Sequence, residues 1–248
     1  MGLVYRVTPW PWTHWPAASK EPPVVLNVVG LSFGWPGSGL NWQNWTHDFS
    51  PGLTFLVGEG ATGKTTALRL LAADLKPTSG QCRLRHRPHA AWVEAWPSPG
   101  VYRSWVFASW TLMEDDPTAV STVFSVEQAV DCCRKAHPTW VEADFFSALQ
   151  DLGLEQGCML KPLNGLSMGM RRKLTMACAI ASWSPVALID DPLAGLDRAS
   201  AASALRALRA QALQKSRCWV VTAYDLPPGF AGTDCIALDG LGANVQRM

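Results

Sequence analysis

The sequence predicts an α/β fold whose core has a mainly parallel β-sheet, with an antiparallel strand pair beside it and an inserted helical lobe. Three observations predict this fold. Residues 53–73 have the pattern of a strand, a glycine-rich turn and a helix. Two strand patterns flank a Pro/Gly turn at residues 36–39. Helical periodicity occupies two stretches between residues 126 and 152, which predicts the lobe.

The length and composition favour one large domain. The chain has 248 residues, of which 48% are hydrophobic, and this is enough for a substantial core. No internal repeat or low-complexity linker divides it. We therefore expect a domain over residues 24–240 with the helical lobe inserted at about 118–183. A Pro/Trp-rich extension at residues 1–23 lacks the apolar core of a signal peptide, and a mobile or packed segment is favoured over a docking segment.

Charge and cysteine content exclude some classes of function. The net charge of +1 predicts no affinity for nucleic acid from bulk electrostatics. The seven cysteines form no CxxC pair, which favours reduced, mostly buried thiols and a cytoplasmic location. The longest apolar run, residues 176–189, is interrupted by serine and proline and is too short to cross a bilayer.

The first strand pair is predicted at residues 24–31 and 40–49. Trp35 lies at the turn between these strands, where an exposed aromatic ring could stack on a nucleobase. Core packing is the alternative for this side chain, because the chain contains 13 tryptophans.

The next element predicts a triphosphate site. The apolar run 53–57 leads into a glycine-rich turn and then a helix, so that backbone N–H groups and the positive end of the helix dipole converge on an anion. Lys64 adds a positive charge for the β- and γ-phosphates, and the Thr65 hydroxyl is the expected Mg²⁺ ligand. We call residues 58–66 the phosphate loop; its members are Gly58, Glu59, Gly60, Ala61, Thr62, Gly63, Lys64, Thr65 and Thr66.

Further strands are predicted at residues 81–85, 90–95 and 105–110, followed by helices at 126–136 and 140–152 that form the lobe. After the lobe, Ser167 has the position of an N-cap for a helix that ends near residue 183. Gly169 leaves backbone N–H groups accessible at the start of this helix, which predicts a second anion-binding helix end.

An apolar strand then ends in two carboxylates. Residues 186–189 predict a buried strand, which Asp190 and Asp191 follow directly. Asp197 precedes an amphipathic surface helix at residues 198–214. The basic run 171–173 is expected to be a solvated face or a partner contact rather than a lipid or nucleic-acid patch.

Four linked motifs resemble the ATP-binding subunit of an ABC transporter. In order, they are the phosphate loop, residues 166–170, residues 189–192 and residues 194–197. The resemblance covers residues 24–239. It implies an ABC ATPase fold, ATP and Mg²⁺ as cofactors, and a homo- or heterodimer in which each ATP lies between the phosphate loop of one subunit and the signature motif of the other. It also implies an integral-membrane permease as partner.

The resemblance implies roles for particular residues. Asp190 would support the metal bound by Thr65, usually through water, and Asp191 would occupy the position of the catalytic glutamate that polarises the attacking water. Ser167 and Gly169 would donate to the γ-phosphate of the partner's ATP. Two further roles follow for single residues: Asp197 would belong to the loop that crosses the dimer interface, and Trp35 would stack on adenine.

Several positions depart from the pattern of the family. Asp191 is one methylene shorter than glutamate, which implies slow hydrolysis, and Tyr224 occupies the position of the family's switch histidine, so we assign it a catalytic role with a neutral phenol. Met168 replaces a signature glycine. No glutamine occurs between residues 81 and 128 to sense the metal and water; Asp115 or Asp116 is a candidate replacement.

The leading functional hypothesis is a cytoplasmic ATP-binding and ATP-hydrolysing subunit, peripheral to the inner or plasma membrane through a permease that it energises. The signature segment 166–173 resembles exporter-type subunits more than importer-type ones. Two alternatives remain open: a hydrolytically impaired regulatory subunit that pairs with a competent ATPase, and a soluble ABC ATPase that acts on DNA or ribosomes. The lack of a basic excess disfavours the second alternative.

Overall fold

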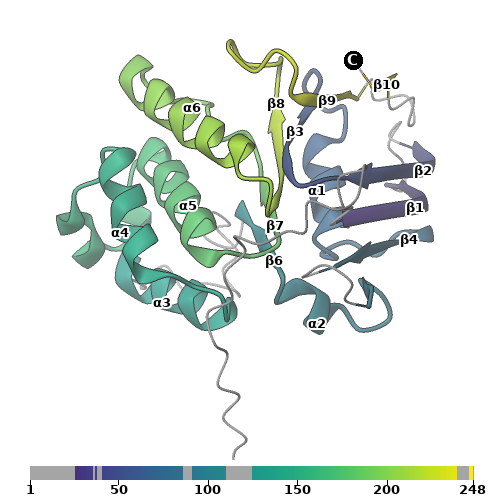
Figure 1. Ribbon diagram of the computed structural model, residues 1–248, viewed down its shortest axis with the longest axis horizontal. Coiled ribbons are helices and arrows are strands. Elements are labelled where there is room, and N and C mark those ends of the chain that lie inside the picture. Colours follow the sequence, from purple (N-terminus) through teal and green to yellow (C-terminus); the bar gives the residue numbers. More distant parts are fainter. Residues whose placement is uncertain are drawn as a thin grey trace, which may run out of the picture.

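The computed structural model describes residues 26–35, 37, 41–85, 91–109, 125–238 and 246–247 (Figure 1). The extension at residues 1–23 and the candidate metal ligands Asp115 and Asp116 lie outside the described residues.

A six-stranded, mainly parallel sheet forms the centre of the molecule. Its order is β10-β9-β3-β8-β7-β6, and all pairs are parallel except β10 with β9. The bounds are β3 Gly52–Val57, β6 Val106–Ala108, β7 Val186–Ile189, β8 Cys218–Ala223, β9 Asp234–Ala237 and β10 Gln246–Arg247. The phosphate loop follows β3 and Asp190 follows β7, and only β8 lies between these two strands. Because the strands are parallel, the phosphate loop and Asp190 lie at the same edge of the sheet.

The predicted antiparallel pair belongs to a larger sheet. Its order is β2-β1-β4-β5, and every pair is antiparallel. The bounds are β1 Leu26–Gly34, β2 Asn41–Phe49, β4 Ser79–Leu84 and β5 Val93–Glu94. The structure thus confirms the predicted fold class and adds two strands to the pair. The partners of β1 and β4 are about 50 residues apart in the chain, and local patterns do not reveal such pairing.

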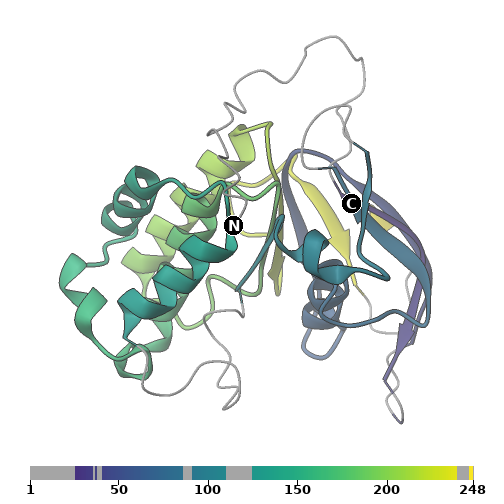
Figure 2. The ribbon, with the colours of Figure 1, turned by 90° about the horizontal axis from the view of Figure 1, so that it is seen from below.

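Helices lie on both sides of the central sheet. Figures 1 and 2 show α3, α4 and α5 gathered on one side, with the antiparallel sheet on the other. The bounds are α1 Lys64–Leu71, α2 Pro99–Arg103, α3 Val126–Ala136, α4 Glu142–Asp151, α5 Met168–Ser182 and α6 Arg198–Leu213. The short helix α2 was not predicted, because its five residues are too few to show a helical period. Among the described helices, none is long and apolar enough to span a membrane.

Alternating side chains of the central strands divide the core in two. On β3, Phe55 packs with α3 to α6, whereas its neighbour Leu56 packs with α1 and the antiparallel sheet. On β8, Val221 packs in the same part of the core as Phe55, and Val220 packs in the same part as Leu56. Successive strand residues point to opposite faces, so each parallel strand is buried on both sides and reads as a continuous apolar run.

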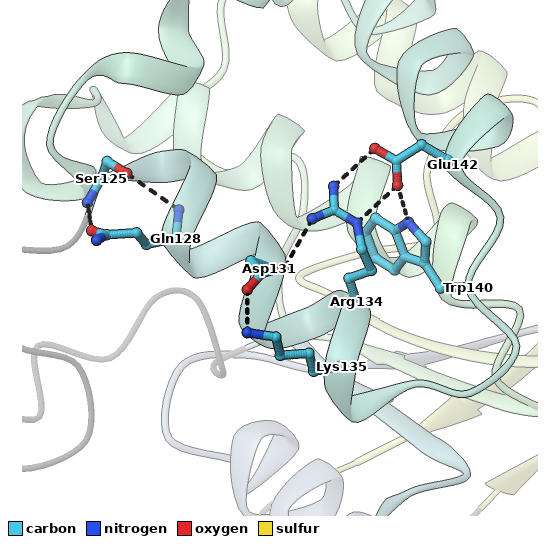
Figure 3. Close-up of polar contacts among 7 residues, drawn as sticks. All are labelled: Ser125, Gln128, Asp131, Arg134, Lys135, Trp140 and Glu142. Atoms are coloured by element: carbon cyan, nitrogen blue, oxygen red, sulfur yellow. Dashed lines mark hydrogen bonds and ion pairs between the residues drawn. The ribbon is translucent and has the colours of Figure 1, made fainter. Parts of the chain in front are cut away.

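The helical lobe is fixed by polar contacts at its surface (Figure 3). Ser125 and Gln128 form a reciprocal capping box at the start of α3. At the other end of α3, the Arg134 guanidinium donates to both oxygens of Glu142 at 2.9 and 2.8 Å, and the Trp140 indole donates to the same carboxylate. This bidentate pair joins α3 to the first residue of α4.

His137, at the end of α3, makes the stability of the fold depend on pH. Its side chain is buried beside the Ser184 hydroxyl, 3.0 Å from Nδ1. Burial, and then the charge of Arg217, lower the pKa of His137 to about 4. The unfolded chain therefore binds a proton below about pH 6.5 that the folded chain rejects, and stability falls as the pH falls.

We expect His137 to account for a loss of about 2 kcal/mol in the free energy of unfolding between pH 8 and pH 5. Urea titrations of the wild type and of His137→Asn at both values of pH measure this loss. The variant should lose about 2 kcal/mol less than the wild type over this interval. Equal losses in the two proteins would show that His137 does not titrate in this way.

Candidate functional site

The phosphate loop joins β3 to α1 and is shaped by its glycines. A Cβ on Gly58 would lie 2.5 Å from the Leu238 carbonyl oxygen, so only glycine fits there without movement. Gly63, the N-cap of α1, has a φ of 92°, in the left-handed region that favours glycine. Inside the loop, the Thr62 hydroxyl donates to the Glu59 carbonyl at 2.9 Å. Space is open around Gly60, and its neighbour Ala61 has a φ of 62°.

Lys64 points into its own loop. Its ammonium group donates to the carbonyl oxygens of Gly58 and Glu59 at 2.5 and 2.6 Å. These two carbonyls hold the charge of Lys64 inside the loop, where the loop N–H groups are expected to gather an anion.

Asp190 is the centre of a small network at the ends of four elements. One carboxylate oxygen accepts from the Thr65 hydroxyl at 2.7 Å, and the other accepts from the Thr222 hydroxyl at 2.6 Å. The Asp190 backbone N–H donates to the Ser109 hydroxyl at 3.0 Å. The network joins α1, β6, β7 and β8, and it places the two predicted metal-ligating residues side by side.

The donor set at this point fits a hard divalent cation. A threonine hydroxyl and a carboxylate are oxygen ligands of the kind that Mg²⁺ prefers, and Mg²⁺ keeps water on its remaining positions. Thr65 would supply the hydroxyl and Asp190 the carboxylate, directly or through water. In the described ranges, no group of three or more His, Cys, Asp or Glu residues could hold a metal ion by itself.

Asp191 follows in a constrained position. Its φ is 44°, a conformation that is uncommon outside glycine, and its N–H donates to the Thr222 hydroxyl at 2.8 Å. Burial raises the pKa of the half-buried Asp191 carboxyl; the positive charge of Arg172 opposes this rise, and Asp190 adds to it. The hydrogen bond from N–H to Thr222 fixes the backbone from which this carboxylate projects.

Tyr224 and Trp35 contact the two ends of the phosphate loop. Tyr224 directly follows β8, its side chain is 62% exposed, and its carbonyl accepts from the Gly58 N–H at 3.2 Å. Trp35 is 41% exposed, and its indole N–H donates to the Thr66 hydroxyl at 3.3 Å. The Trp35 ring therefore lies beside the first turn of α1, with part of its surface open to a stacking partner.

The second predicted anion site lies at the start of α5. Ser167 caps this helix by accepting from the Met170 N–H at 3.2 Å. A Cβ on Gly169 would lie 3.2 Å from the Leu196 side chain, so a glycine lets α5 approach the loop that follows Asp191. Asp197 ends this loop and caps α6, accepting from the backbone N–H of Ser200 at 2.9 Å. Hydrogen bonds from Ser200 lower the pKa of Asp197.

Three residues of this region were missed by the sequence reasoning. Ser109 and Thr222 contact Asp190 from 81 and 32 residues away. Ser109 lies in no recognisable motif, and Thr222 begins the run that contains Tyr224 but was not expected to contact Asp190. Arg172 was expected on a solvated face or at a partner contact, but its guanidinium donates to the Ala194 carbonyl of the same chain. Arg172 and Gly169 are three residues apart in α5, so both lie on one side of the helix. This spacing could have indicated that both contact the same segment, the loop that follows Asp191.

These features together define a P-loop nucleotide-binding domain with an attached helical lobe. Sequence comparison gives the family: the ABC transporter family matches residues 43–194, more than half of the chain, and this protein belongs to it. It is an ABC ATPase domain, a class of domain that binds ATP.

Curated relatives are similar at low identity. "ABC transporter G family member 8" of Arabidopsis thaliana is 27% identical over 68% of this chain and 27% of its own length. "Hemin import ATP-binding protein HmuV" of Streptomyces coelicolor is 29% identical over 74% of this chain and 63% of its own length. "Zinc import ATP-binding protein ZnuC" of Halorhodospira halophila is 26% identical over 88% of this chain and 74% of its own length. The chain thus spans less than two thirds of the first two relatives.

Solved structures share the fold. The ATP-binding subunit of an ABC transporter superimposes with a TM-score of 0.72 at 18% identity, covering 90% of this chain and 89% of the other. A dimeric bacterial ABC transporter cassette gives a TM-score of 0.71 at 15% identity, over 90% of this chain and 97% of the other. These similarities confirm the ABC ATPase fold.

Proposed function

We propose that this chain is the ATP-binding and ATP-hydrolysing subunit that energises transport by a separate integral-membrane permease. The observation that carries the proposal is the convergence of Lys64, Thr65, Asp190 and Asp191 at one edge of the central sheet, joined by the bond between Thr65 and Asp190. Relatives named as ATP-binding proteins for hemin and zinc import support the link to transport. The signature segment favours export, and a relative named as a cytochrome c biogenesis export protein supports testing this direction first.

The proposed mechanism uses groups that the fold places together. N–H groups of the phosphate loop bind the β- and γ-phosphates, and Lys64 exchanges its two loop carbonyls for phosphate oxygens. Trp35 stacks on the base. Mg²⁺, held by Thr65 and Asp190, would neutralise charge on the phosphates. Asp191 accepts a hydrogen bond from the water that attacks the γ-phosphorus, and the bond to ADP breaks to give ADP and phosphate.

The site is completed by a second subunit, identical or homologous. Ser167 and Gly169 of that subunit would donate to the γ-phosphate, and Asp197 would lie near the interface. In the subunit whose phosphate loop binds the ATP, the exposed Tyr224 hydroxyl also donates to a phosphate oxygen. The subunit would remain peripheral to the inner or plasma membrane through its permease, without nucleic acid as a partner.

The test is ATP hydrolysis by the purified chain, with Lys64→Ala as the blank. We expect the wild type to turn over above the blank and Asp191→Asn to fall by about 10²-fold or more, the usual contribution of a general base. Asp151→Asn, a carboxylate on α4, is the matched control and should keep wild-type turnover. Wild-type activity at the level of the blank, both alone and with the permease present, would refute hydrolysis.

The second candidate is a regulatory subunit that binds ATP without hydrolysing it. The short carboxylate of Asp191 and the phenol of Tyr224 favour it. Asp191→Glu separates the two functions: if the shortened side chain is the defect, this variant alone turns over while both proteins bind ATP. If neither turns over, the regulatory subunit becomes the better assignment.

A further inference from the structure

Arg172 connects α5 to the loop that follows Asp191. It lies in the second turn of α5, and its Nη1 donates to the carbonyl oxygen of Ala194. A Cβ on Gly195 would lie 3.3 Å from the same nitrogen, and Gly195 has a φ of 67°. The guanidinium is therefore packed against the backbone of this loop, and glycine at position 195 leaves room for it.

One donor of Arg172 is not used. Its Nε is buried and has no hydrogen-bond partner among the described residues. An unpaired buried N–H costs about 1–3 kcal/mol. The other contacts of the Arg172 side chain must therefore offset this cost to keep the guanidinium buried. The charge of Arg172 also acts on Asp191, whose pKa it lowers against the effect of burial.

The loop touches α5 at a second point. Leu196 packs on Gly169, one turn before Arg172 on the same helix. Two contacts on one side of α5 thus fix the loop between Asp191 and Asp197. Within the loop, the N–H groups of Ala194 and Leu196 donate to the carbonyls of Asp191 and Leu193, both at 3.3 Å. Thr222 holds the Asp191 N–H at the start of the loop, and these long bonds leave the anchoring of residues 194–196 to the contacts with α5.

We propose that Arg172 is a positioning residue for hydrolysis: it holds the loop 191–197 against α5 and thereby fixes where the Asp191 carboxylate lies. Because Ser167 caps α5, a nucleotide bound there by a second subunit would contact the same helix that carries Arg172. The role in hydrolysis rests on the proposed function, whereas the anchoring of the loop does not.

Arg172→Gln tests the inference with two independent measurements. Amide hydrogen exchange without nucleotide should become at least about fivefold faster for residues 191 and 193–197, because one charged hydrogen bond is lost. With ATP and Mg²⁺, kcat should fall about tenfold or more while KM stays within about twofold, because Arg172 does not contact the phosphate loop. Arg172→Lys, which keeps the charge and one donor, should recover part of kcat.

Arg206→Gln is the matched control. Arg206 is exposed on α6 and donates to Ser203 on its own helix, so neither measurement should change. Unchanged exchange of the loop in Arg172→Gln would overturn the inference, whatever happens to kcat. So would an equal loss of kcat in Arg172→Lys and Arg172→Gln. Faster exchange together with a wild type that lacks hydrolysis would uphold the anchoring and refute the proposed function instead.

Discussion

Replacing Lys64 with alanine should abolish most of the stabilisation that ATP gives the protein. The ammonium group makes two charge-assisted hydrogen bonds to loop carbonyls, and phosphate oxygens would replace these carbonyls when nucleotide binds. Two such bonds support an affinity difference of about 100-fold. At an ATP concentration of about 100 times the wild-type Kd, linkage then predicts about 2.7 kcal/mol of stabilisation for the wild type and about 0.4 kcal/mol for the variant.

Thermal unfolding with and without ATP and Mg²⁺ measures this difference. Lys161→Ala is the control, because Lys161 is an exposed lysine of the helical lobe and should leave the shift unchanged. Without nucleotide, Lys64→Ala should unfold close to the wild type, because the loop carbonyls can turn to water. An ATP-dependent shift in Lys64→Ala equal to that of the wild type would place the nucleotide elsewhere.

Local pattern was sufficient for the elements that carry the site. The apolar run before Gly58 and the helix after Gly63 appear as β3 and α1, and Ser167 and Asp197 cap the helices that were expected to begin there. Each of these features depends on residues within a few positions of one another. Dihedral preferences and hydrogen bonds to adjacent N–H groups decide them, and both are visible in sequence.

Long-range contacts account for what the sequence did not reveal. Thr65 and Asp190 were expected to share a metal, but the hydroxyls of Ser109 and Thr222 that hold Asp190 come from β6 and β8. A serine or threonine at the end of a strand is common, and only the order of strands in the sheet brings these two to Asp190. The predicted replacements for the missing glutamine, Asp115 and Asp116, lie outside the described residues and remain a prediction.

The largest effect on stability is expected at Arg217. This side chain is 1% exposed, and no carboxylate in the described part of the chain forms an ion pair with it. It instead donates to carbonyl oxygens at the end of α5: those of Ala179 and Ser184 at 2.8 Å and that of Ile180 at 3.1 Å. The Ala179 carbonyl also accepts from the Ser182 hydroxyl, and the Ile180 carbonyl also accepts from the Trp183 N–H. The negative end of the helix dipole offsets the charge of Arg217. Burial lowers the pKa of Arg217 to about 9, so it remains charged at neutral pH.

Arg217→Met keeps much of the volume but removes three charged hydrogen bonds, and it leaves the Ser184 carbonyl without a donor among the described residues. At about 1–3 kcal/mol for the unsatisfied Ser184 carbonyl and about 1 kcal/mol for each of the two other lost bonds, we expect a loss of about 3 kcal/mol, which lowers Tm by about 10 °C. Arg217→Lys, with one ammonium group in place of a planar fork, should lose about half as much. Arg206→Met removes an exposed arginine and should change Tm little.

A Tm for Arg217→Met within about 2 °C of the wild type would mean that water enters and satisfies the carbonyls. In that case the end of α5 does not depend on Arg217, and the rigidity of α5 that the anchoring through Arg172 requires must come from its apolar contacts alone.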